Sequence, residues 1–484
     1  MNIVRGITKI KPGDQHALDG IVENPILEDF LLSNVRLWDA RSDFTQDGKS
    51  VVVKNGRIGT VSETPPTGFT GRVIEGARKT LIPGLIDAHV HMFYDSGPEL
   101  FKNPYPLLKK FYVDTKGLTE YSPQIVRRGL LKLKSGTTTM RILGDGYYSL
   151  KYRDALKNWD IVGPRVFTAG LHVNGPSGYI TRGFGQIFDE DQKRNIAVEI
   201  TSFEEIAPKM ESHIGTGIDV VKIATTHGTM LEDAEPDLPE EWVREIVKIA
   251  HQHGLKVTSH TYGEKGDWAA IRGGVDGIEH LVNVSRELSD EMISEIKARG
   301  IVVCPTLSGS TYSITNLLNN KEILVNDPDI IANVPAAVRK DIYLTLWMFK
   351  LPGFTRFAMK EPKLFEKWEH RYKQTFANTA KLYAAGVKLI FGTDIPQLMG
   401  NFWHSVMDEV RALKLAGVSN SDILKMATIN AAKAIGVEDR IGTIEEGKLA
   451  DLVLINGNPL QDIETLRDVE MVVKEGRIVF KHLP

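Results

Sequence analysis

The chain has 484 residues, enough for two or three domains or for one large barrel with an appendage. Hydrophobic residues make up 42% and charged residues 25% of the sequence, which is typical of a globular protein and excludes extensive disorder. The formal net charge of -3 gives no overall field that would attract nucleic acid or anionic lipid. We therefore expect a small-molecule substrate, with neither nucleic acid nor membrane as a partner.

The N-terminal segment MNIVRGITKIKPGDQHALDG carries lysines and an aspartate where a signal peptide would be apolar. No apolar run reaches the roughly 18 residues that a membrane-spanning helix needs. Cys304 is the single cysteine, so an intramolecular disulfide and an all-thiolate metal site are excluded. The expected location is the cytoplasm, and we expect a homo-oligomer there.

Short alternating strands, separated by Gly, Pro and Asp turns, are expected near both ends of the chain. Residues 30–83 contain FLLSNVRLWD, SVVVKNGRIGTVS and RVIEGARKTLIPG, and the C-terminal GKLADLVLINGNP and DVEMVVKEGRIVF have the same texture. The later KEGRIV also echoes the earlier KNGRIG. We predict that segments 1–83 and 436–484 form one composite β-sandwich beside a separate central domain.

The central segment, residues 84–435, alternates apolar strand-like runs with amphipathic helical stretches, as repeated β/α units do. Helical stretches such as EEWVREIVKIAHQHG and SDEMISEIKARG end in glycine, a common residue after a last helical turn. The predicted fold class is therefore α/β, with a closed (β/α)8 TIM barrel. The expected strands are 85–91, 137–143, 165–173, 219–225, 255–260, 277–280, 301–306 and 387–394.

The connection between the last two expected strands is far longer than a β/α unit requires, which predicts an insertion at about 308–360. Its segment 334–350 has apolar residues at helical spacing, and ordinary helix packing explains that pattern. The alternative is an aromatic lid over the active-site face of the barrel. The aromatic residues of this lid would be Tyr343, Trp347, Phe349, Phe354 and Phe357.

Side chains able to bind metals stand at the ends of several expected strands. His89 and His91 end the first strand, and since strand side chains repeat with a period of two, both point into the barrel mouth. His260, His280 and Asp394 end later strands. Core packing could explain an isolated His-x-His pair, but hardly this whole set at strand tips. Histidine and carboxylate without cysteine form a ligand set for Zn, Mn, Fe or Co in hydrolytic sites.

Lys222 lies within the fourth expected strand, with the same parity as Val220 and Ala224. A lysine cation facing a barrel interior is costly to bury, so Lys222 either faces outward or has an altered charge. Reaction of its deprotonated amine with CO2 would give a carbamate. Such a carboxylate-like group could bridge two metals held by the histidines and Asp394.

Three further segments stand out: LIPGLIDAHVH, KSGTTTMRILG and MATINAAKAIGVEDRIGTIEEGKLADLVLINGNPLQDI. With the strand-tip residues, they resemble the amidohydrolase superfamily, especially its imidazolonepropionase-like and prolidase-like branch. The resemblance implies a metal-bearing (β/α)8 barrel with a composite β-sandwich and two divalent ions, expected to be zinc. The ligands it implies are His89, His91 and Asp394 for the more buried metal, His260 and His280 for the second, and N6-carboxylated Lys222 between them.

The resemblance also implies a reaction, in which a hydroxide bridging two metals attacks a carbonyl group that one metal polarises. Asp394 is the expected catalytic residue, taking the proton of the nucleophile and delivering it to the leaving nitrogen. We expect hydrolysis of an amide C–N bond in a dipeptide, an N-acyl amino acid or a cyclic amide. Esters, lactones and phosphotriesters remain open, because the same hydroxide attacks them all. A non-catalytic scaffold is a further alternative, although such a scaffold would be expected to have lost ligands.

Substrate contacts are expected from residues just beyond the strands, although a plain loop role explains each of them as well. The candidates are Asn174, Tyr179, His227 and His404. His251 and His253 stand at the end of a helical stretch before Gly254, where helix capping accounts for them without chemistry.

Overall fold

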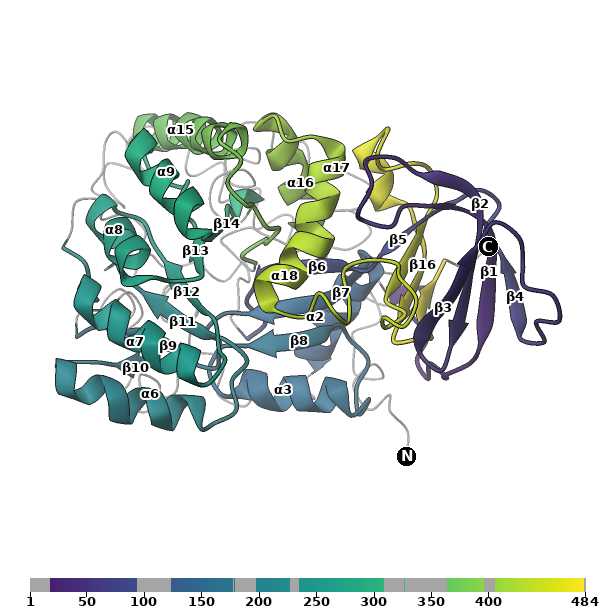
Figure 1. Cartoon of the computed structure of the whole chain (residues 1–484), viewed down its shortest axis with the longest axis horizontal. Coiled ribbons are helices and arrows are strands. Elements are labelled where there is room, and N and C mark those ends of the chain that lie inside the picture. Colours follow the sequence, from purple (N-terminus) through teal and green to yellow (C-terminus); the bar gives the residue numbers. More distant parts are fainter. Residues whose placement is uncertain are drawn as a thin grey trace.

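The computed structural model describes residues 18–93, 123–176, 178, 197–226, 235–308, 326, 364–395 and 405–482. It consists of a barrel surrounded by helices and a β-rich unit beside it (Figure 1). None of the described helices combines the length and the apolar character that a membrane-crossing helix needs. Most of the predicted insertion at 308–360, with all five aromatic residues of the lid, lies outside the described residues.

The β-rich unit is one eight-stranded sheet built from both ends of the chain, as the sequence predicts. Strand β5 from the N-terminal segment pairs antiparallel with β15 from the C-terminal segment. The sheet curls round a core of its own, and residues 56–58 bond to residues 447–450 just before β15. Its strands are β1 Phe30–Leu37, β2 Gln46–Lys54, β3 Arg57–Ser62, β4 Arg72–Glu75, β5 Thr80–Pro83, β15 Leu452–Ile455, β16 Val469–Lys474 and β17 Arg477–Lys481.

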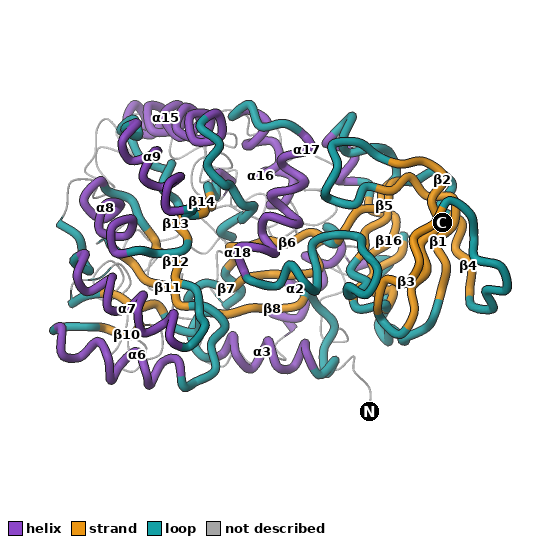
Figure 2. The backbone as a smooth tube through the Cα atoms, in the orientation of Figure 1, coloured by secondary structure: helices purple, strands orange, loops and turns teal. Residues whose placement is uncertain are grey.

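The central segment forms the predicted parallel barrel, whose strands run through the middle of the helical part in Figure 2. Two hydrogen-bonded groups of strands make up its wall, and single parallel bridges at Leu389 and Ile395 join the two groups at one side. The strands are β6 Leu85–Val90, β7 Thr137–Ile142, β8 Arg165–Thr168, β9 His172–Asn174, β11 Val221–Ala224, β12 Val257–His260, β13 Gly277–Glu279 and β14 Val302–Cys304, with the short β10 Ala197–Glu199 beside β9.

Two expected strands differ from the structure. The stretch 165–173 is two strands, because Gly170 has a left-handed φ of +62° that interrupts the ladder. β8 pairs with β7, whereas β9 pairs with β11, so the break lets the third strand change neighbours. The stretch 387–394 takes the eighth position with isolated bridges instead of a regular strand, and Asp394 there has a φ of +53°.

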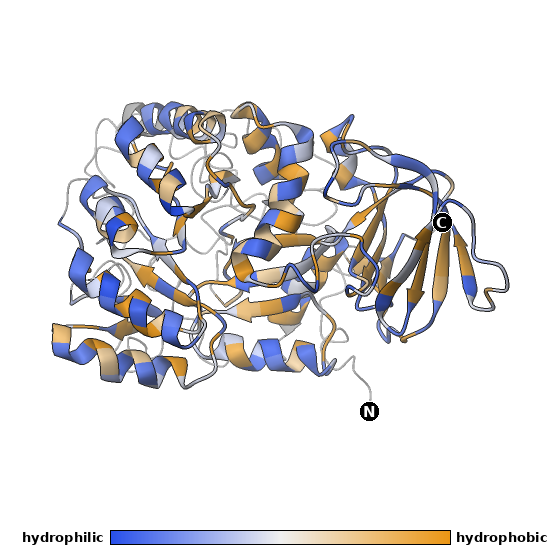
Figure 3. Ribbon diagram, viewed as in Figure 1, coloured by the Kyte–Doolittle hydropathy of each residue, from blue (hydrophilic) through white to orange (hydrophobic). Residues whose placement is uncertain are grey.

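The barrel helices cover its outer wall, and their turns alternate between hydrophilic and hydrophobic while the strands are mostly hydrophobic (Figure 3). In α7, for example, Val243, Ile246 and Ala250 are buried on one face. Gly300 adopts the left-handed conformation directly after α9, as the glycine in SDEMISEIKARG predicts. The helices are α2 Pro123–Lys134, α3 Tyr148–Lys157, α6 Ile206–Ile214, α7 Glu240–Gln252, α8 Glu264–Gly273, α9 Asp290–Arg299, α15 Leu364–Ala384, α16 Ser405–Leu415, α17 Asn420–Lys425 and α18 Ala431–Ile435.

Candidate metal centre

The His-x-His pair and Asp394 converge on one point at the carboxyl ends of the barrel strands. The Nε2 atoms of His89 and His91 each lie 3.3 Å from Oδ1 of Asp394. All three side chains are buried, and one ligand atom of each lies within 4.8 Å of the others. Two imidazole nitrogens and a carboxylate oxygen facing one space are a suitable ligand set for a divalent transition metal.

The backbone brings Asp394 to this point through the pairing of the last barrel segment with β6. The Asp394 amide donates to the His89 carbonyl at 2.7 Å, and the His91 amide donates to the Ile395 carbonyl at 2.6 Å. The positive φ of Asp394 is uncommon for a residue other than glycine. Such strain, held in place by neighbouring hydrogen bonds, is often found where a functional side chain must be aimed.

Two carboxylates that the sequence analysis missed hold the rings of the His-x-His pair. Nδ1 of His89 lies 2.7 Å from Oε2 of Glu279, and Nδ1 of His91 lies 2.5 Å from Oδ1 of Asp145. Each carboxylate accepts a hydrogen bond from Nδ1–H, so that Nε2 is the ring nitrogen directed at Asp394. This orientation is the one that a metal-ligating histidine requires.

His260 and His280 form a second pair of imidazoles beside the first. The ring centroid of His280 lies 4.8 Å from that of His260 and 4.7 Å from that of His89. Nδ1 of His280 is 2.6 Å from the hydroxyl oxygen of Thr306. Because His280 has a φ of +67°, the alternation of β13 is broken, and Glu279 and His280 both reach the centre although they are neighbours in sequence.

Lys222 lies on β11 and points into the barrel interior, not outward. Its side chain is buried, and its Nζ atom has no hydrogen-bond partner among the described residues. Burial lowers the pKa of the Lys222 ammonium to about 8, although the carboxylates of Glu279 and Asp394 act in the opposite direction. Burying an amine without a hydrogen-bond partner costs free energy. The surroundings of Lys222 therefore suit an additional group bound at its Nζ atom.

Burial and nearby positive charge keep most imidazoles of the centre neutral. The pKa values of His89, His260 and His280 are held well below the usual range, mainly by burial and further by neighbouring cations. His91 differs, since the charges of Asp145 and Asp394 outweigh burial and raise its pKa to about 9. Neutral imidazoles are the form that binds metal ions.

Of the four candidates for substrate contact, the structure describes only Asn174. Asn174 is buried as the last residue of β9, not in a loop beyond it, and its amide nitrogen donates to the Gly175 carbonyl at 3.0 Å. Tyr179, His227 and His404 lie outside the described residues. His251 and His253 are exposed at the end of α7, where each bonds to an acidic side chain.

His172 is a residue that the sequence analysis missed. It lies on β9, is buried, and its ring centroid is 6.5 Å from that of His91. Gly144 leaves room for it, because a Cβ atom at that position would lie 2.1 Å from the His172 ring. The signal was present in GLHVN, but the break at Gly170 hid the position of His172 on the barrel wall.

A closed (β/α)8 barrel with buried imidazoles and a carboxylate at its carboxyl-terminal face is typical of metal-dependent hydrolytic enzymes. The comparisons with known proteins define the family. Residues 80–479 match the amidohydrolase family, and the chain belongs to this family of hydrolytic enzymes.

Individual relatives agree with that assignment. The chain is similar to ochratoxinase from Aspergillus niger, with 25% identity over 424 residues that cover 83% of this chain and 75% of the relative. It is similar to the crystal structure of a Xaa-Pro dipeptidase with bound methionine in the active site, at 25% identity and a TM-score of 0.70, over 94% of this chain and 100% of that one. The A. niger ochratoxinase structure has a TM-score of 0.70 at 19% identity, over 94% of this chain and 96% of that one, and it supports the fold alone.

Proposed function

We propose that this protein is a binuclear metal-dependent hydrolase that cleaves an amide C–N bond. His89, His91 and Asp394 would hold one divalent ion, His260 and His280 a second, and a carboxylated Lys222 would lie between them, with zinc as the expected metal. The observation that carries this proposal is the Lys222 amine, buried among these ligands with no hydrogen-bond partner in the described part of the chain.

Carboxylation of Lys222 is chemically balanced. The neutral amine attacks CO2, forms a C–N bond and releases one proton, which gives a carbamate of charge -1. The lowered pKa of Lys222, about 8, increases the fraction of neutral amine near neutral pH. The product would replace a buried cation by an anion and neutralise part of the charge of the two metals, which supports the modification.

Divalent ions at this centre would acidify a water molecule and polarise a carbonyl group of the substrate. The chain's own groups supply the remaining functions. Asp394, within 3.3 Å of both His89 and His91, takes a proton from the nucleophile and passes it to the leaving nitrogen. Glu279 and Asp145 fix the two rings and thereby limit the motion of the ligand atoms.

The substrate class we propose is a dipeptide, an N-acyl amino acid or a cyclic amide. The names of two relatives support this choice, since one is a Xaa-Pro dipeptidase and the other an ochratoxinase. Esters, lactones and phosphotriesters are the alternative substrates for the same centre. The buried Cys304, which has no disulfide partner, agrees with the cytoplasmic location that we propose.

Matched substrate pairs test this function. The protein purified with zinc would be assayed on dipeptides and N-acyl amino acids and on ester analogues of the same compounds. The proposal expects amide hydrolysis that a chelator abolishes and zinc restores. Cleavage of only the esters, lactones or phosphotriesters would select the alternative class, and a zinc-loaded protein inactive on every class would favour the scaffold.

A further inference from the structure

A cavity lies at the opposite end of the barrel from the metal centre. It has a volume of about 580 Å³, within the usual range for small-molecule sites. Its wall includes the residues at which three barrel strands begin, namely Val257, Gly277 and Val302. The ligand-type histidines stand at the other ends of these strands or of their neighbours, so the cavity is separate from the metal centre.

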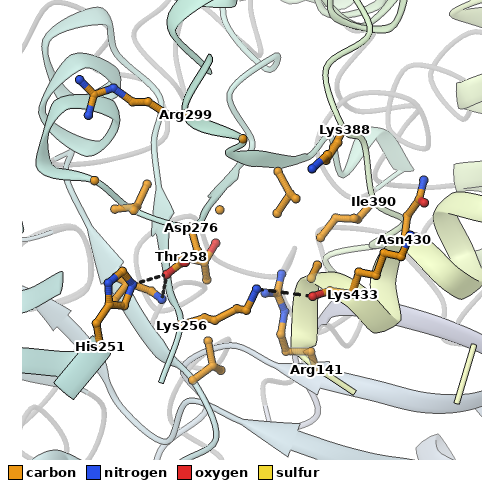
Figure 4. A pocket seen from close by; sticks show the side chains of 18 residues that line it. Arg141, His251, Lys256, Thr258, Asp276, Arg299, Lys388, Ile390, Asn430 and Lys433 are labelled. Atoms are coloured by element: carbon orange, nitrogen blue, oxygen red, sulfur yellow. Dashed lines mark hydrogen bonds and ion pairs between the residues drawn. The ribbon is translucent and has the colours of Figure 1, made fainter. Parts of the chain in front are cut away.

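Cations from several elements are among the residues that line this cavity (Figure 4). Lys256 precedes β12, Lys388 precedes the last barrel segment, and Lys433 is on α18. Arg299, the last residue of α9, adds a guanidinium group and is paired with Glu295 at 2.6 Å. These cations come from parts of the chain that are distant in sequence, and the fold alone brings them to one cavity.

The positive charge of the cavity is not balanced by the described residues around it. Asp276 is the only acidic residue among the described lining residues, and it accepts hydrogen bonds from His251 at 2.9 Å and from the Val257 amide at 2.8 Å. Lys256, Lys388 and Lys433 form no ion pair with any described acidic side chain. The chain as a whole has a formal net charge of -3, so the charge of this cavity is opposite in sign to the net charge of the molecule.

Helix chemistry explains only part of this arrangement. Lys433 and Arg299 stand in the last turns of α18 and α9, where a cation complements the helix carbonyl groups. Lys256 precedes β12 and donates to the Lys433 carbonyl at 3.5 Å, in the last turn of α18. Lys388 precedes the last barrel segment, where no such role exists. Helix chemistry therefore does not explain the presence of Lys388 in the lining, or why the other three cations share one cavity with it.

Hydrogen bonds hold the polar side chains on one side of the cavity. Arg141 lines it, and its guanidinium is held by the Glu279 carboxylate at 2.7 Å and by the Ala88 carbonyl at 2.6 Å. Thr258, also in the lining, donates to the same carboxylate at 2.6 Å. Hydrogen-bonded polar groups on one side and the exposed lysines Lys256, Lys388 and Lys433 on the other form a site that suits a compact charged ligand.

We propose that this cavity binds a small anion with two or more negative charges, either a phosphate ester or a polycarboxylate. Both kinds of ligand present several anionic oxygens that lysine ammonium groups can bind, and the cavity is too small for a nucleic acid. The site does not depend on the proposed metals or on turnover, so the two proposals can fail separately.

Isothermal titration calorimetry with two probes tests the proposal. Fructose 1,6-bisphosphate represents the phosphate esters, and tricarballylate represents the polycarboxylates. We expect saturable binding of at least one probe, weakened when NaCl is raised from about 0.05 to about 0.3 M. Binding of only one probe would identify the ligand class. Binding of both would show that the cavity selects anions by their number of charges and not by their chemical class.

Charge-removing variants assign the binding to this cavity. Lys256→Met, Lys388→Met and Lys433→Met should each weaken binding about threefold, and the triple variant at least about tenfold. Lys414→Met, at an exposed lysine outside the cavity, should bind as the wild type does. All variants keep the metal ligands, so chelation of metal by a probe would be unchanged. Absence of saturable binding by either probe, or equal affinity in the wild type and the triple variant, would overturn the proposal.

Discussion

Glu279 is the residue on which the described hydrogen bonds of the centre converge. One of its oxygens faces Nδ1 of His89, and the other accepts from Arg141 and Thr258. Burial alone would raise the pKa of Glu279, but the charges of Arg141 and Lys222 outweigh it and lower the pKa. The carboxylate therefore stays ionised inside the barrel, where it can orient His89 and polarise the ring.

Glu279→Gln should weaken metal binding while the fold is kept. The amide cannot accept hydrogen bonds from all three donors, so His89 loses its fixed orientation, and we expect metal affinity to fall by about 10- to 100-fold. Competition with a chromogenic chelator measures this directly. Glu438→Gln, at an exposed site, is the control, and equal affinities in the two variants would show that Glu279 does not orient a metal ligand.

Lys222→Ala should lose at least one of two bound metals and most of the activity, because it removes the proposed bridging group. Short carboxylic acids added to the variant should restore part of the activity by occupying the space of the carbamate. Metal content and hydrolysis rate are the two measurements. A variant that keeps two metals and a near-normal rate would remove Lys222 from the centre.

At the scale of elements, helix α16 places an ionisable group against the barrel. Glu409 is fully buried; one oxygen accepts from the Ser308 amide at 2.6 Å, and the other has no hydrogen-bond partner among the described residues. Burial raises the pKa of Glu409 from its usual 4.5 to about 8, and the charge of Asp87 adds to the effect. The structure thus favours the protonated carboxyl near neutral pH.

This raised pKa predicts a pH dependence of stability. Between about pH 4.5 and pH 8 the folded state keeps a proton that the unfolded state releases, so stability falls as the pH rises, by at most about 1.4 kcal/mol per unit. Glu409→Gln should remove this contribution, so the stability of the variant relative to the wild type should increase as the pH rises. Melting temperatures between pH 5 and pH 9 test it, with Glu438→Gln as the control. Parallel curves for wild type and Glu409→Gln would contradict the assignment.

The sequence predicted the helices and strands better than the hydrogen-bond partners of the histidines in the site. Periodicity alone identified the alternation of strands and helices, and the positions of His89, His260 and Asp394 followed from strand ends. Glu279 was missed because regular alternation would turn it away from His280, and only the positive φ of His280 brings both to the centre. Asp145 and Thr306 reach the histidines through tertiary contacts that no sequence spacing reveals.

At the scale of the whole molecule, a buried ion cluster connects the terminal sheet to the barrel. Arg165 on β8 pairs with Asp451 and, at 2.7 Å, with Glu475, and both acids belong to the C-terminal segment. Trp159, just after α3, is covered by Lys474 and Arg477 at 4.3 and 4.4 Å from its ring centroid. These contacts fix the sheet against the barrel wall. The domain limits at residues 83 and 436 stay a prediction.

Arg165→Ala should destabilise the protein by about 3–5 kcal/mol, because it leaves the buried Asp451 carboxylate unpaired. Arg153→Ala is the matched control, since its pair with Asp219 is more exposed and should contribute about 1 kcal/mol or less. Chemical denaturation of both variants measures the two losses of unfolding free energy. Equal losses of stability would mean that the cluster around Arg165 is no stronger than an ordinary surface pair.

X-ray diffraction from crystals of the zinc-loaded protein, recorded on both sides of the zinc absorption edge, tests whether two metals bind around a carboxylated Lys222. We expect two anomalous peaks at the carboxyl-terminal face of the barrel, one beside His89, His91 and Asp394 and one beside His260 and His280. We also expect density for a carboxylated Lys222 between the peaks. An unmodified Lys222 directed away from the metals, or a single peak at full zinc occupancy, would contradict this proposal.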